Sequence, residues 1–396
     1  MDHMDTPLEL FIFIDALGWR IAQHHHFLED LMPYRQPVTM QFGYSCTALP
    51  TILSGKKPVD HGHLSFFYLD PANSPFKAFR LLKHVLKPAA LWDRGRVRHQ
   101  LSKLFRAVYG YTGYFQLYAV PFDRLPYFNY CEKKNIFGPE GLAPVPNLFD
   151  LLLRSGLQFH ITDWHLSEAQ NFALAGDAAA RQDMNFIFLY TASLDALLHN
   201  HVGDDKVIQQ KLDFFDFNIR KLMQVAKSHH RRCHVTIISD HGMTPLSGVF
   251  DAKTEIAATP LVFGKDYTAC YDATMARFWF HRPGAEECIR QAMAQAPGHW
   301  LSDDEKRRYG IDFPDHKYGD AIHLLDPGWQ IAPSDMGVKP LKGMHGYTPD
   351  DESANASLLS DTPFDDCPVE DVADLFALMK KRIQDMRLDA LENITL

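Results

Sequence analysis

Three short apolar runs predict the buried strands of this chain. Residues 10–14, 186–190 and 235–238 are almost continuously apolar and lack the alternation of a half-exposed strand. The segments 19–31, 147–155 and 206–229 have helical character. This alternation of strands and helices predicts an α/β fold in which helices sandwich a mostly parallel central sheet.

Two long segments depart from this pattern. Residues 70–145 are rich in aromatic residues, prolines and basic residues, and residues 255–340 contain a second set of short strand and helix patterns. We interpret both as insertions. The predicted division is a catalytic core of residues 1–69, 146–254 and 341–396, a basic and aromatic insertion at 70–145, and an α+β cap insertion at 255–340.

Composition narrows the classes of partner. The 396 residues are 46% hydrophobic and 22% charged, which is typical of a globular protein. The formal net charge is -9, so we expect no nucleic-acid duplex as a partner. Between Lys77 and Arg106, however, nine basic residues accompany one acid, Asp93, a net +8. This stretch fits a solvated helix face, peripheral membrane contact through residues 77–106, or steering of an anionic substrate.

The cellular location is predicted from what the sequence lacks. The six cysteines form no Cys-x-x-Cys pair, and residues 1–15 lack the basic and long apolar regions of a signal peptide. We expect reduced thiols and a cytoplasmic protein. The oligomeric state stays open.

Acidic and imidazole side chains follow the predicted strands. Carboxyl ends of parallel strands meet at one edge of a sheet, so these side chains should converge. Mixed nitrogen and oxygen ligands suit Zn²⁺, and this number is sufficient for two ions. Two ions about 4 Å apart can hold the attacking and leaving oxygens of a phosphoryl transfer. The candidate ligands are Asp15, Asp195, His199, Asp240, His241 and His345.

A hydroxyl group near a predicted helix start completes this chemistry. In Gly43-Tyr44-Ser45-Cys46-Thr47, Ser45 would gain from backbone N–H groups and the positive end of the helix dipole. A neighbouring metal would lower its pKa and make it a nucleophile. We favour Ser45, with Thr47 as the alternative hydroxyl.

The order of these segments resembles the alkaline phosphatase superfamily and, within it, the type I phosphodiesterase/nucleotide pyrophosphatase family. The shared order is Asp, hydroxyl nucleophile, Asp-x-x-x-His, Asp-His-Gly and His-Gly. Ser45 lies ten residues before Gly55, where this superfamily places its nucleophile. Serine at this position disfavours sulfatase chemistry, since sulfatases have a modified cysteine there and Cys46 is one residue away.

The resemblance implies a ligand set and a reaction. One ion would bind Asp195, His199 and His345, and the other Asp15, Asp240 and His241 beside Ser45. Zn²⁺ is the expected metal and Mn²⁺ the alternative. Ser45 would attack phosphorus, and a water activated by the first ion would hydrolyse the phospho-enzyme. The implied activity is phosphodiester or pyrophosphate hydrolysis. The alternatives are a phosphomonoesterase, a phosphotransferase and a metal-bound module without catalysis.

One departure concerns the substrate. Phe66 stands where the family has an asparagine that contacts a phosphate oxygen, which puts nucleotide substrates in doubt. We expect a small-molecule, lipid-linked or glycan-linked phosphate ester. Candidate substrate contacts are Phe66, Lys56 and Lys57, with Arg277 as a further cation.

Three other histidines attract attention as a run. His24, His25 and His26 are consecutive, and three consecutive helical positions cannot share one face. We therefore expect solvated side chains there.

Overall fold

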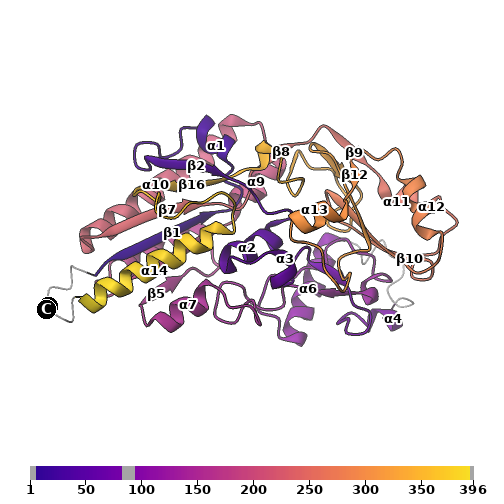
Figure 1. Ribbon diagram of the computed structural model, residues 1–396, viewed down its shortest axis with the longest axis horizontal. Coiled ribbons are helices and arrows are strands. Elements are labelled where there is room, and N and C mark those ends of the chain that lie inside the picture. Colours follow the sequence, from indigo (N-terminus) through magenta and orange to yellow (C-terminus); the bar gives the residue numbers. More distant parts are fainter. Residues whose placement is uncertain (1–5, 83–93, 393–396) are drawn as a thin grey trace.

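The computed structural model describes residues 6–82 and 94–392, and its centre is a six-stranded sheet (Figure 1). The four strands at the predicted core run parallel to one another, and β16 runs antiparallel to both of its neighbours, β7 and β2. This confirms the predicted fold class. In spatial order the strands are β2 (Tyr34–Val38), β16 (Ala356–Ser360), β7 (Cys233–Ile238), β1 (Leu8–Ile14), β6 (Phe186–Thr191) and β5 (Phe159–Ile161).

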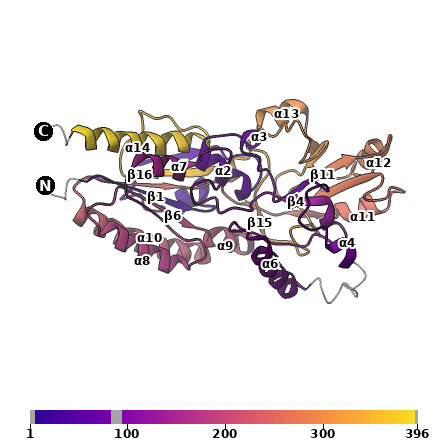
Figure 2. The same cartoon turned by 90° about the horizontal axis from the view of Figure 1, so that it is seen from below.

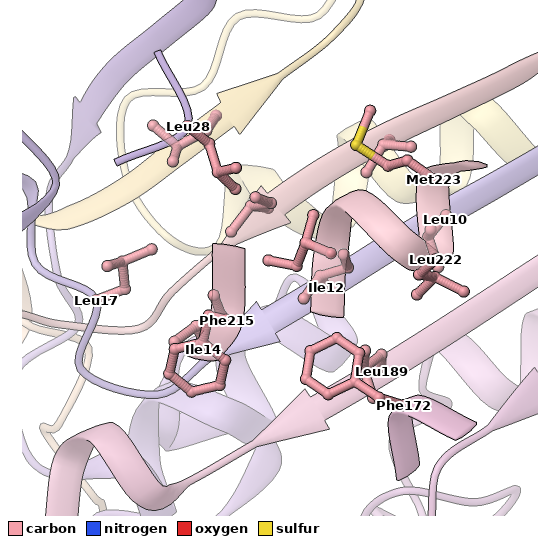
Figure 3. Packing of buried hydrophobic residues seen from close by; sticks show 14 of the residues in the cluster. Leu10, Ile12, Ile14, Leu17, Leu28, Phe172, Leu189, Phe215, Leu222 and Met223 are labelled. Carbon is pink, nitrogen blue, oxygen red and sulfur yellow. The ribbon is translucent and has the colours of Figure 1, made fainter. Parts of the chain in front are cut away.

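Helices cover both faces of this sheet, which explains why its central strands are apolar throughout. All seven residues of β1 are buried, and alternate side chains face opposite layers. Leu10, Ile12 and Ile14 pack against one layer, as Figure 3 shows, while Phe11 and Phe13 pack against the other. The first layer is α1 (Trp19–His24), α8 (Glu168–Ala179), α9 (Ser193–His201) and α10 (Asp205–His229); the second is α2 (Ser45–Ser54), α7 (Leu148–Ser155) and α14 (Asp374–Glu392).

Local sequence explains where one predicted helix begins and why another is shorter than predicted. Asn147 caps α7, accepting from the backbone N–H groups of Phe149 and Asp150. The helix expected over 19–31 ends at His24 instead. His26 and Leu28 have φ values of +48° and +53°, left-handed conformations that an α-helix does not contain.

The remaining secondary structure lies beyond the end of the sheet opposite to the chain termini (Figures 1 and 2). Residues 255–340 form an antiparallel sheet with helices α12 (Ala285–Ala292) and α13 (Asp303–Arg308). The other insertion contains α4 (Phe79–Leu82), α6 (Gly95–Tyr109) and β4 (Phe128–Tyr130), which pairs with β3 (Phe67–Leu69). The exact boundaries between core and insertions stay a prediction. The antiparallel sheet consists of β10 (Tyr267–Tyr271), β11 (Met275–Phe280), β13 (Ala321–Leu324) and β12 (His299–Trp300).

Two small additional pairings lie near the boundary between cap and core. β9 (Gly248–Phe250) of the core pairs with β14 (Trp329–Ile331) of the cap, and β8 (Thr244–Pro245) pairs with β15 (Gly343–Met344) within the core. Over the described ranges, no helix has both the length and the apolar character needed to cross a membrane.

A contact between two glycines brings the loops after β1 and β7 together. A Cβ on Gly18 would lie 2.5 Å from Cα of Gly242, and a Cβ on Gly242 would lie 2.4 Å from the carbonyl oxygen of Ser353. No side chain fits between these backbones. The loops that carry Asp15 and Asp240 therefore depend on glycine for their approach.

Replacing Gly242 should destabilise the fold. We expect Gly242→Ala to lower the free energy of unfolding by about 1–3 kcal/mol, because the backbone must move to admit the methyl group. Gly176→Ala is the matched control: no atom lies within 4 Å of its added Cβ, and it stands inside α8. That change should stabilise by about 0.5–1 kcal/mol. Urea unfolding of both variants measures the difference, and equal effects would contradict the close-contact argument.

Candidate active site

The structure brings the six predicted ligands to one edge of the sheet. Asp15 follows β1, Asp240 and His241 follow β7, and α9, which carries Asp195, follows β6. Two groups of three have ligand atoms within 4.8 Å of one another, and His241 belongs to both. These groups are Asp15, Asp240 and His241, and Asp195, His241 and His345.

The sixth residue, His199, lies one helical turn after Asp195. Its Nε2 is 3.5 Å from Oδ2 of Asp195, while Nε2 of His345 is 3.6 Å from Oδ1 of the same carboxylate. Asp195 thus lies between two imidazoles.

Each of two buried carboxylates has one oxygen held by the protein and one without a partner. Oδ2 of Asp15 accepts from the Tyr190 hydroxyl at 2.8 Å, and Oδ1 of Asp240 accepts from the backbone N–H groups of Ala16 and His241 at 3.3 and 3.1 Å. Oδ1 of Asp15, Oδ2 of Asp240 and Oδ1 of Asp195 are buried without a hydrogen bond. Such oxygens are costly in a fold unless a cation binds them. The donor set therefore fits divalent metal ions.

Hydrogen bonds from Nδ1 to backbone carbonyl oxygens orient two of the imidazoles. Nδ1 of His199 lies 2.9 Å from the carbonyl oxygen of Gly343, and Nδ1 of His241 lies 2.8 Å from that of Gly242. Because a carbonyl oxygen only accepts, each Nδ1 carries a proton, which leaves Nε2 as the nitrogen that can ligate a metal. This arrangement is typical of histidines that ligate a metal.

The electrostatics of the pocket also favour a cation. Burial, followed by the charges of Asp240 and Asp195, raises the pKa of Asp15 well above its ordinary value. Burial likewise raises the pKa of Asp240, and it lowers the pKa of His345. Burial would also raise the pKa of Asp195, but His199 outweighs it and the pKa falls. The pocket thus concentrates carboxylates that repel one another beside an imidazole held neutral.

Ser45 begins α2 and faces this pocket. Its Oγ lies 3.0 Å from Nε2 of His241, to which it donates. The alternative hydroxyl, Thr47, is fully buried and donates to the carbonyl oxygen of Leu64 at 2.6 Å. Thr47 therefore anchors the following loop, and the geometry favours Ser45 as the reactive group.

The predicted cationic contacts do not reach this pocket. Lys56 and Lys57 follow the far end of α2, so a helix about 15 Å long separates them from Ser45. Nζ of Lys57 bonds to Asp371 at 2.9 Å. Arg277 is fully buried and bonds to Asp272 at 2.6 Å and to the carbonyl oxygen of Phe67 at 2.9 Å. Arg277 therefore holds the cap against β3, which begins at Phe67.

Phe66 belongs to an aromatic cluster. Its ring centroid lies 5.4 Å from that of Tyr114 and 5.5 Å from those of Tyr118 and Tyr130. The Tyr118 hydroxyl donates to that of Tyr114 at 3.1 Å. Burial raises the pKa of Tyr114, and the charges of Glu132 and Asp195 raise it further.

Sequence reasoning missed Tyr190 and this cluster. Tyr190 stands at the end of the second apolar run, and a hydroxyl at a strand end next to Asp15 was a usable signal. Tyr114 and Tyr118 lie in the aromatic insertion, where no spacing identifies which rings converge. The cluster depends on the pairing of β3 with β4.

The basic residues between Lys77 and Arg106 do not share one environment. Lys83, Lys87 and Asp93 lie outside the described residues. Arg98 is buried and donates to the carbonyl oxygens of Tyr118 and Val120, so it is no part of a solvated face. Peripheral membrane contact through residues 77–106 stays a prediction.

Comparisons with solved structures identify proteins of similar fold. The fold matches murine ectonucleotide pyrophosphatase/phosphodiesterase 5 with a TM-score of 0.66 at 15% identity over 95% of each chain. The human protein of the same name gives 0.65 at 14% identity over 95% of each chain. An inactive variant of the murine protein in complex with AMP gives 0.65 at 15% identity, covering 96% of this chain and 95% of that one. These likenesses show a shared fold.

The sequence comparisons extend this result. No curated protein sequence matches the chain. The model of a family of phosphoric ester hydrolases that use divalent metals matches residues 10–348, nearly the whole chain. The chain therefore belongs to the type I phosphodiesterase/nucleotide pyrophosphatase family.

Proposed function

We propose that this hydrolase cleaves phosphodiesters through a Ser45 phospho-enzyme at a site for two Zn²⁺ ions. The observation that carries the proposal is the Ser45 hydroxyl, 3.0 Å from His241 and beside buried carboxylate oxygens that have no partner. Imidazole and carboxylate ligands suit Zn²⁺. Asp195, His199 and His345 would hold one ion, and Asp15, Asp240 and His241 the other.

In the proposed reaction, each of several residues of the chain has a separate role. Ser45 attacks phosphorus, the alcohol departs with its oxygen, and water then cleaves the phosphoserine to restore the hydroxyl. The backbone N–H groups at the start of α2 face the developing negative charge. When bound, the ions supply positive charge to the phosphate and leaving oxygens and lower the pKa of the nucleophile. Tyr190 keeps Asp15 oriented throughout.

The aromatic cluster suggests how the substrate is bound. A phenyl ring at position 66 offers no hydrogen-bond donor to a phosphate oxygen, so the phosphate depends on the metal site and α2. We assign the organic group of the ester to the side of Phe66 and Tyr114. The murine relative bound to AMP supports a small-molecule phosphate ester as substrate.

A phosphomonoesterase is the second candidate, and the same residue favours it. Monoester and diester enzymes can share these ligands, and the missing amide at position 66 removes a contact that is typical of the nucleotide-cleaving relatives. A direct comparison of ester classes separates the two activities.

Substitution of Ser45 tests the nucleophile. We expect Ser45→Ala to reduce turnover of a p-nitrophenyl phosphodiester by at least about 10³-fold, because the covalent route is lost. Bound Zn²⁺ per chain should stay unchanged, since the ligands remain. Assays on the zinc-loaded protein should compare phosphodiester, phosphomonoester and sulfate. Wild-type turnover that survives in the variant would exclude Ser45 as nucleophile, and a monoester preference would support the second candidate.

Tyr190 offers a test of metal binding. Tyr190→Phe removes the hydrogen bond that orients Asp15, so we expect Zn²⁺ affinity to fall by about 10- to 100-fold. Tyr130→Phe is the matched control, because its hydroxyl is buried without a partner. Competition with a chelator measures both affinities. Equal affinities in the two variants would contradict the proposed role of Tyr190.

Glu132 gives a pH test of the aromatic cluster. Burial raises the pKa of this carboxyl from 4.5 to about 8, so the folded protein keeps it neutral where the unfolded chain ionises it. Stability relative to Glu132→Gln should therefore be highest below pH 4.5. It should fall by up to about 1.4 kcal/mol per pH unit up to about pH 8 and then level off. Urea unfolding of both proteins across this range measures the difference. A constant difference would show that the carboxyl is not desolvated in solution.

A further inference from the structure

The histidine run at the end of α1 forms a cluster that its sequence spacing did not predict. α1 ends at His24, and the side chains of His24 and His25 both approach Asp205, the first residue of α10. Nε2 of His24 lies 3.3 Å from Oδ2 of Asp205, and Nε2 of His25 lies 4.0 Å from Oδ1. The three donor atoms lie within 4.8 Å of one another.

One of these spacings matches that of two ligands of a common ion. Two ligands at the usual zinc distances in a tetrahedral site lie about 3.3–3.4 Å apart, as Nε2 of His24 and Oδ2 of Asp205 do. The 4.0 Å between Nε2 of His25 and Oδ1 of Asp205 is too long for a hydrogen bond. Asp205 therefore does not hydrogen-bond to His25.

A relay of polar side chains orients His25. Its side chain is only 6% exposed, and its Nδ1 lies 2.8 Å from Oε1 of Gln209. Because that amide oxygen accepts, Nδ1 carries the proton and Nε2 presents a lone pair. The amide of Gln209 donates in turn to Asp213 at 2.8 Å, which fixes its orientation. A ligating histidine in a metalloprotein is typically held by such a contact.

We propose that His24, His25 and Asp205 form a separate binding site for a divalent transition-metal ion of the Zn²⁺ type. Two imidazoles and a carboxylate provide three ligands, and water completes the coordination because His24 and Asp205 are about two-thirds exposed. The proposed catalytic site uses none of these residues.

The position of the cluster suggests what an ion there would do. It joins α1, which follows the loop of Asp15, to α10, which follows the helix of Asp195 and His199. An ion that binds only the folded chain stabilises it by mass action. Binding here would therefore tie together the two segments that extend from the proposed catalytic ligands.

Equilibrium dialysis of the full chain against micromolar Zn²⁺ tests this proposal. We expect His25→Ala and Asp205→Asn each to bind one ion fewer per chain than the wild type. His26→Ala is the matched control, because His26 contacts Glu29 and lies outside the cluster. It should bind as many ions as the wild type. Gln209→Leu should weaken this one site by about 10- to 100-fold.

The outcomes separate this site from the catalytic one. The difference between wild type and His25→Ala should be one ion whether or not the catalytic pocket holds two. Turnover at saturating Zn²⁺ should be unchanged in His25→Ala, whereas the rise in Tm with Zn²⁺ should be smaller. Equal stoichiometry in wild type and His25→Ala would overturn the proposal, as would the same loss in His26→Ala.

Discussion

The repulsion among buried carboxylates at the edge of the sheet is the constraint on which the functional part of this structure depends. Asp15, Asp195 and Asp240 crowd together because they follow three adjacent parallel strands. Burial raises the pKa of Asp15 and Asp240, so without compensation the fold would favour protonation of these two groups. The free imidazole nitrogens and unpaired oxygens face the same space, where bound cations would remove the repulsion.

The surrounding backbone is adapted to this arrangement at some cost. Ala16 adopts a left-handed φ of +62°, which directs its N–H toward Asp240. Gly18 and Gly242 let the two loops approach more closely than any side chain would allow. These features add no apolar burial; they position charged groups. Stability therefore comes from the helices on both faces of the sheet, whereas the loops at its end are specialised for ligand geometry.

The sequence was most informative where one local signal determined the structure. The strands around Phe11, Leu189 and Ile237 were predictable because strands buried on both faces are apolar throughout. Predicting that the candidate ligands converge needed only the rule for parallel strands. Lys57 and Arg277 were candidate substrate contacts in the sequence, but the sequence does not show which acidic group a basic side chain pairs with. Each is paired with an aspartate, and Arg277 is buried by strands of the cap.

The histidine run at residues 24–26 also shows that sequence alone does not reveal tertiary partners. All three histidines were expected to be solvated, as the first and the last are, but the side chain of His25 is only 6% exposed. It bonds to Gln209 of α10, a tertiary contact that sequence spacing does not encode. Likewise, the ring of Phe66 finds its neighbours through tertiary pairing that no spacing encodes. The proposed metal ligands all come from the core, whereas the proposed substrate wall combines Phe66 of the core with Tyr114 of the insertion. A substitution of Tyr114 would therefore alter this wall without replacing a proposed ligand.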